Sequence, residues 1–339
     1  MSETYPLRPC RWHIFVHDCE SSSFFTAVMW VTAAVGYLIF FLGLCLLCWR
    51  WGIKKNRVIG LSTIDSYIVI NSIGFGLGRA LDSTALALVW FSNATWAQLS
   101  SDIPYVCGLI SVWIYLCSLV RMTPAYTTDT IWLPSPSLLK IIRHAYLLTS
   151  AITIIPVGIF SGRARDAGDL DRESLLTCIL YLLYSFFCGV LSAGFAFFGR
   201  QMVRVAEASA ADLKANSRSR IQTSTAGSMG CKGGETTSAG TTKSGDSRMR
   251  KAIGKMKLFN WTFTCIFLWF AAVLMVFSFR ADTLFATTWW SRIQSIGTNV
   301  MTVILVLIGY GGLIWGEFHS PDDEINENLS GAGSKTVPV

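Results

Sequence analysis

Seven apolar segments limit what this chain can fold into more strongly than any other feature. The chain has 339 residues, of which 52% are hydrophobic and 14% are charged, a balance too apolar for an ordinary soluble domain. A helix of about 20 residues crosses the roughly 30 Å hydrocarbon core of a bilayer. The segments cover residues 24–49, 58–86, 104–120, 145–160, 174–199, 258–279 and 293–315. We therefore expect an all-α integral membrane protein, a seven-transmembrane helix bundle.

The distribution of basic residues predicts the orientation of this bundle. Positive charge next to membrane spans stays on the cytoplasmic side. Of the 28 Lys and Arg residues, twenty lie on one side of the expected spans and seven on the other, and Arg79 lies within a span. The N-terminus is therefore expected outside and the C-terminus in the cytoplasm. The outer loop before the third span contains Asn93-Ala94-Thr95, so we expect Asn93 to be glycosylated.

A long basic segment at residues 200–257 divides the chain. It contains twelve Lys or Arg residues, and its middle part is rich in Ser, Thr and Gly, which bury too little apolar surface to order a chain. We expect an outer N-terminal tail at 1–23, helices 1–5 at 24–199, a basic, largely disordered cytoplasmic loop at 200–257, helices 6–7 at 258–315, and an acidic disordered cytoplasmic tail at 316–339. In the outer tail, Cys10 and Cys19 could form one disulfide or remain free thiols.

Charged residues in the second apolar segment are the candidates for a ligand or switch site. A charge at the centre of a membrane helix costs about 2.5–3.5 kcal/mol on insertion scales. Asp65 and Arg79 share one helical face, and Asp82 lies one turn beyond Arg79. Two interpretations stay open: Arg79 binds an anion or changes partner, or Arg79 and Asp82 form a structural pair near the outer interface. Asn299 in the seventh segment could hydrogen-bond to this face.

Several function classes have no support in the sequence. The apolar segments contain no Lys for a retinal Schiff base, and the four His residues lie in tails or at segment edges, where they cannot ligate membrane haems. Motifs for metalloproteases, serine hydrolases and nucleotide binding do not occur. The basic residues follow the positive-inside pattern and do not indicate nucleic acid. We expect no enzyme activity, no cofactor, no metal and no nucleic-acid partner.

Basic residues at the inner ends of the third and sixth segments are candidates for partner coupling. On a helix that continues the sixth segment into the cytosol, alternating basic and apolar residues form one face. This face could meet an acidic cytosolic partner, or its lysines could bind only anionic lipid, and both interpretations stay open. The candidates are Arg121, Lys251, Ile253, Lys255, Met256 and Lys257.

The architecture resembles a G-protein-coupled receptor, with seven spans, an outer N-terminus, a glycosylation motif outside and a long basic third cytoplasmic loop. Leu119-Val120-Arg121 keeps only the Arg of the acidic-Arg-aromatic triplet of rhodopsin-like receptors, and the Asn-Pro-x-x-Tyr motif is missing. Two short stretches, Gly78-Arg79-Ala80-Leu81 and Asp102-Ile103-Pro104, are similar to the tobamovirus-multiplication family and its receptor-like orphan relatives. The resemblance implies signal transduction.

We expect a receptor-like seven-helix membrane protein that senses an unknown ligand from the outer side and signals through the third cytoplasmic loop. The expected partners are the lipid bilayer, the ligand and a cytosolic signalling protein, such as a heterotrimeric G protein. The expected location is multi-pass in the plasma membrane. A seven-helix transporter or channel, and a membrane scaffold that recruits cytosolic proteins, are the alternatives.

Overall fold

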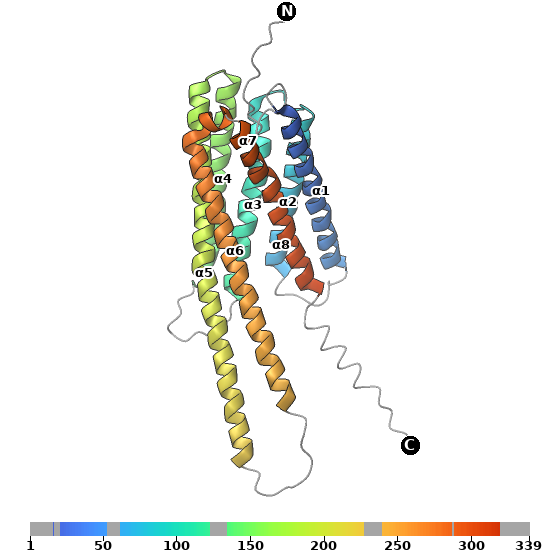
Figure 1. Ribbon diagram of the computed structural model, residues 1–339, viewed down its shortest axis with the longest axis vertical. Helices are drawn as coiled ribbons and strands as arrows, with labels where there is room; N and C mark the ends of the chain where they lie inside the picture. The colour runs from blue at the N-terminus through green and yellow to red at the C-terminus, as the bar shows by residue number, and fades with distance from the viewer. Residues whose placement is uncertain are drawn as a thin grey trace, which may run out of the picture. The chain divides into compact units, whose positions relative to one another are not determined.

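The computed structural model describes Val16 and residues 21–52, 62–122, 134–226, 239–286 and 288–318. Every regular element in these residues is a helix, so the all-α prediction is confirmed for this part of the chain (Figure 1). The elements are α1 (Ser22–Gly52), α2 (Ser62–Ala87), α3 (Ala94–Met122), α4 (Pro136–Asp166), α5 (Leu170–Ala226), α6 (Ala239–Ala286), α7 (Thr288–Ser295), the π-helical turn η1 (Ile296–Val300) and α8 (Met301–Phe318).

Six stretches of the described helices are long and apolar enough to cross a membrane, which indicates an integral membrane protein. They are Ser22–Trp49, Ala94–Ser118, Pro136–Asp166, Leu170–Ala208, Asn260–Phe279 and Trp289–Ile308. The six do not include α2, which has 26 residues but contains Asp65, Arg79 and Asp82. The charges that mark α2 as a candidate site are therefore also what separates it from the apolar helices.

The described helices belong to two compact units, Met1–Gly108 with Asp282–Val339, and Leu109–Ala281. In the first unit, α1 and α2 approach so closely that only glycine fits at their contact. A Cβ added to Gly36 would lie 2.8 Å from the carbonyl oxygen of Gly76, and one added to Gly76 would lie 2.8 Å from Cγ2 of Ile39. Small residues allow such close helix packing in membranes. This contact fixes α2 against α1.

An apolar cluster lies beside this contact, toward the C-terminal end of α1. Its buried members come from α1, α2 and α8: Ile39, Leu46, Leu47, Val69, Phe75 and Val303. Because these side chains point inward rather than toward lipid, they pack α8 against the paired helices α1 and α2. The first unit therefore has an apolar core in the half that holds the C-terminal end of α1.

In the second unit, α5 and α6 lie side by side and antiparallel, and both extend beyond α4 (Figure 1). The hydroxyl of Ser185 donates to the carbonyl of Ala271 (2.7 Å), and the hydroxyl of Ser192 donates to that of Thr264 (2.9 Å). One heptad further along, the side chain of Asn260 packs on Gly199. These contacts are seven residues apart on α5, and seven and then four residues apart on α6. Both spacings keep the contacts on one helical face, as in a coiled-coil-like seam.

Several element boundaries differ from those expected. Helix α3 begins at Ala94 rather than near residue 104, because Asn93 accepts a hydrogen bond from the backbone of Trp96 (2.9 Å) at the first turn. Pro104 fits inside α3 because Gly78 of α2 leaves room for its ring, whose Cγ would lie 2.5 Å from an added Cβ. The connection between α4 and α5 is shorter than the expected segment at 161–173 and covers only residues 167–169.

Residues 200–226 and 239–257 are helical, which differs from the largely disordered loop expected at 200–257. Packing between α5 and α6 continues a short way past the apolar segments. Met202 and Val205 are buried, and Nζ of Lys257 lies 2.6 Å from a carboxylate oxygen of Glu207. The structure does not describe residues 227–238. It also leaves out 1–15 and 17–20 of the expected tail at 1–23, which include Cys10 and Cys19, and 319–339 of the expected tail at 316–339.

Candidate functional site

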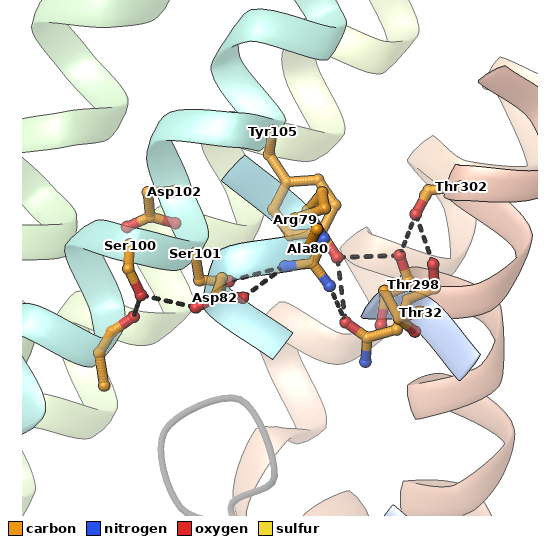
Figure 2. Close-up of polar contacts among 12 residues, drawn as sticks. Thr32, Arg79, Ala80, Asp82, Ser100, Ser101, Asp102, Tyr105, Thr298 and Thr302 are labelled. Atoms are coloured by element: carbon orange, nitrogen blue, oxygen red, sulfur yellow. Dashed lines mark hydrogen bonds and ion pairs between the residues drawn. The ribbon is translucent and has the colours of Figure 1, made fainter. Parts of the chain in front are cut away.

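Arg79 on α2 is the centre of a buried polar network in the first unit (Figure 2). Its side chain and that of Asp82 are each only 1% exposed, and Nη1 of Arg79 lies 2.8 Å from Oδ2 of Asp82. The spacing of three residues along one helix brings the two side chains together. Nη2 of Arg79 donates to Oδ1 of Asn299 in η1. The cation therefore joins an anion on its own helix to an amide on another element.

Helix α3 completes the surroundings of this ion pair. The hydroxyl of Ser100 donates to the second carboxylate oxygen of Asp82 (2.6 Å), and Oγ of Ser101 lies 3.5 Å from Nη1 of Arg79. The ring of Tyr105 lies against the guanidinium, with its centroid 4.6 Å from Cζ. A buried ion pair stabilises a fold only when further hydrogen bonds satisfy both partners. The residues of α3 supply these bonds, so the ion pair can be kept in the interior.

The backbone of η1 is part of the network. The N–H of Met301 donates to the carbonyl of Ile296, five residues earlier, as in a π-helix. The hydroxyl of Tyr105 donates to the carbonyl of Thr298 (2.8 Å), next to Asn299. Single π turns occur frequently at functional sites. The site thus joins a charged pair on α2, a tyrosine on α3 and an irregular backbone turn.

The polar network ends at the apolar cluster of the first unit. Along α2, Phe75 lies one turn before Arg79, and along α8, Val303 lies one turn after Asn299; both side chains are buried in that cluster. The ion pair and its partners are therefore bordered, one helical turn away on both α2 and α8, by side chains of the apolar cluster.

Two buried polar atoms near the ion pair have no hydrogen-bond partner among the residues that the structure describes. They are Nε of Arg79 and the hydroxyl oxygen of Ser83, which is one turn further along α2. A buried donor without a partner carries the cost of its lost hydration. The network therefore retains unused hydrogen-bonding capacity at Arg79, on the edge of the guanidinium that includes Nε.

Three of the four residues expected in the ligand or switch site, Arg79, Asp82 and Asn299, lie together. Asp65 is in the first turn of α2, about 21 Å along the helix axis from Arg79, and its side chain lies outside the described part of the structure. The sequence interpretation did not include Ser100 and Ser101, because residues up to 103 were expected to form a loop. It did not include Tyr105 either, because a tyrosine within an expected apolar segment carries no charge that would mark it. The spacing of four residues between Ser101 and Tyr105 was the available signal for one helical face.

The candidates for partner coupling lie in the second unit. Arg121 is exposed in the last turn of α3, Ile253 is half-buried, and Lys257 forms the ion pair with Glu207. The side chains of Lys251, Lys255 and Met256 lie outside the described part of the chain, although their backbone is in α6. Lys257 therefore has an acidic partner within the protein itself, in addition to the two roles considered from sequence.

No group of metal-ligating side chains occurs among the described residues, and the network itself consists of one guanidinium, carboxylate, hydroxyl and amide groups. These groups can hold a polar ligand or exchange hydrogen bonds. Compared with known proteins, the chain matches no family model, no curated protein and no solved structure.

Proposed function

We propose that this protein is a receptor-like seven-helix membrane protein, with its N-terminus outside and its C-terminus in the cytoplasm. In this proposal a ligand from the outer side acts on the Arg79 network, and the extended ends of α5 and α6 pass the signal to a cytosolic protein. A heterotrimeric G protein is the first partner to test. The observation that carries the proposal is the buried Arg79–Asp82–Asn299 network, which borders the apolar cluster of the first unit.

The seventh span of this proposal is α2. Its 26 residues give a length of about 39 Å, more than the roughly 30 Å of a hydrocarbon core. Its two most central charges, Arg79 and Asp82, neutralise each other and are both buried, so they do not meet lipid. Its contact with α1 through Gly36 and Gly76 runs between two helices of spanning length. These features support the proposal that α2 crosses the membrane with its charges shielded from lipid by neighbouring helices.

A transporter or channel needs a polar route through the whole bilayer. In the first unit, Phe75 and Val303 of the apolar cluster lie one turn from Arg79 and Asn299, so packed apolar side chains border the polar network on that side. A network bordered in this way is better suited to binding a ligand than to passing one, which favours the receptor over the transporter. A scaffold would use the ends of α5 and α6 but would not need a buried ion pair.

Replacing Asp82 with Asn is the experiment that separates a receptor from a scaffold. The amide keeps the shape of the side chain but removes the charge that holds Arg79, so the network should favour its released state. A biotin ligase fused to the C-terminus reports nearby cytosolic proteins in cells. We expect the set of labelled proteins to change between wild type and Asp82→Asn at equal surface expression. An unchanged set would exclude the receptor proposal and favour the scaffold.

The orientation is tested through Asn93 and the segment between α5 and α6. Arg121 and Asn93 are about 42 Å apart along α3 and its cap, so an inner position for Arg121 places Asn93 outside the membrane. We expect Asn93→Gln to remove the mass of one glycan from the protein on a denaturing gel. An epitope inserted at residues 227–238 should bind antibody only after the cell is permeabilised. Binding on intact cells would invert the proposed orientation.

A further inference from the structure

The π turn η1 sets the rotation of α7 relative to α8. One π turn holds one residue more than an α turn, and the bond from Met301 to Ile296 marks this extra residue. A single residue in an α-helix corresponds to a rotation of about 100° and a rise of 1.5 Å. If η1 became α-helical while α8 stayed in place, α7 would therefore turn and move by one residue position.

Two other helices hold η1 in its π form. The hydroxyl of Tyr105 on α3 donates to the Thr298 carbonyl (2.8 Å), and the guanidinium of Arg79 on α2 donates to the side chain of Asn299. From the first turn of α8, the hydroxyl of Thr302 donates to the carbonyl of Asn299 (3.0 Å). Side chains thus bind the carbonyls of Thr298 and Asn299, which both lie in the π turn. The π form depends on contacts made by the Arg79 network.

Buried polar groups of α7 lack hydrogen-bond partners among the described residues in the register that η1 imposes. Ser291 and Gln294 are each 2% exposed. The hydroxyl of Ser291 and both polar atoms of the Gln294 amide have no hydrogen-bond partner within the described ranges. Buried polar groups in proteins are nearly always paired, because an unpaired one loses its hydration without compensation. The contacts at η1 favour this register, and the unpaired groups of α7 oppose it.

We propose that η1 is a register switch. While Tyr105 and Arg79 are hydrogen-bonded to Thr298 and Asn299, the π turn keeps the polar face of α7 buried. When these hydrogen bonds break, the turn becomes α-helical and α7 shifts by one residue. Helix α8 stays in place because Val303 is fixed in the apolar cluster. The hydrogen bond from Arg292 to Ser21 (2.6 Å) ties α7 to α1 in the present register and is given up.

The shift moves each residue of α7 to the place of the residue before it. Gln294 takes the place of Ile293, which is 44% exposed, and Ser291 takes the place of Trp290, which is 53% exposed. Ser295 takes the buried place of Gln294 and remains covered. The switch therefore predicts a gain of exposure at position 294 without a gain at position 295. It stands independently of the receptor proposal.

Cysteine labelling measures this difference directly. Cleavage after Arg292 releases a peptide that begins at Ile293, and no native cysteine follows that position in the chain. Gln294→Cys and Ser295→Cys are compared, each with native Tyr105 and Asn299 and each with Tyr105→Phe and Asn299→Ala. N-ethylmaleimide labelling of the purified protein in lipid nanodiscs is followed by mass spectrometry. We expect labelling at position 294 to become severalfold faster in the doubly changed background and labelling at 295 to stay slow.

Equal rates at position 294 in both backgrounds, with both proteins folded by thermal melting, would overturn the switch. A similar rise at positions 294 and 295 would overturn it too, because it indicates general loosening rather than rotation. Deletion of Gly297 supplies the second arm. With the extra residue removed, an α-helical turn keeps α7 in its present register. The deletion should therefore keep position 294 protected even with Tyr105→Phe and Asn299→Ala, and rapid labelling there would contradict the proposal.

Discussion

Replacing Arg79 with Leu should destabilise the protein by about 3–5 kcal/mol, because it leaves the carboxylate of Asp82 buried without its cation. The change also removes the hydrogen bond to Asn299. The expected result is a large loss of folded protein at the cell surface and a clear decrease in melting temperature in detergent. The network thus makes one arginine necessary for a helix bundle that is otherwise held together by apolar packing.

Arg163→Leu is the matched control, because Arg163 is exposed on α4 and should tolerate the change. Arg292 is not a suitable control, since it donates to Ser21 and lies over the ring of Phe24 at 5.2 Å. The double change Arg79→Leu with Asp82→Leu removes both charges and should recover much of the lost stability. Equal, small effects of Arg79→Leu and Arg163→Leu would show that the ion pair contributes nothing to folding.

Gly36→Ala and Gly189→Ala should change stability in opposite directions, although the chemical change is identical. The new Cβ at position 36 would lie 2.8 Å from the Gly76 carbonyl oxygen and 3.0 Å from the Ala80 nitrogen, both backbone atoms that cannot rotate away. Overpacking of this kind costs about 1–3 kcal/mol. The Cβ at position 189 meets nothing within 4 Å, and alanine favours a helix over glycine by about 1 kcal/mol.

Thermal melting of the purified variants checks this prediction. We expect a lower melting temperature than wild type for Gly36→Ala and an equal or higher one for Gly189→Ala. Gly76→Ala should behave like Gly36→Ala, because its Cβ meets the same contact from the opposite helix, at 2.8 Å from Ile39 and 3.0 Å from the Gly36 carbonyl oxygen. A melting temperature for Gly36→Ala at or above that of Gly189→Ala would show that α1 and α2 can move apart without loss of stability.

The helices could be predicted from the sequence wherever an apolar segment was long, because this signal is local. Arg79 and Asp82 could be predicted as a site for the same reason, since a charge in an apolar helix is costly wherever it is placed. Asn299 was expected only as a possible partner, and its hydrogen bond to Arg79 is present. The contributions of Ser100, Ser101 and Tyr105 depend on packing between helices, which a single sequence does not reveal.

Three features had no local signal at all. Pro104 indicates a helix start, yet it lies inside α3, because a glycine on a different helix leaves space for its ring. The π turn at Ile296–Val300 differs from an α-helix by one residue and has no distinctive composition. Residues 200–226 and 239–257 are polar enough to suggest disorder, yet they are helical, and next to the apolar segments Lys257 of α6 contacts Glu207 of α5. Each depends on a partner distant in sequence.

The length of α5 turns small rotations into large displacements. Its 57 residues form a continuous helix of about 85 Å, so the helix acts mechanically as a lever. A tilt of roughly 5° about its Leu170 end would move the Ala226 end sideways by about 7 Å at a rise of 1.5 Å per residue. The seam with α6 stiffens this lever, because Ser185 and Ser192 bind the backbone of the neighbouring helix. A protein docked at the Ala226 end would therefore be displaced by several ångströms, although the residues near Leu170 would hardly move.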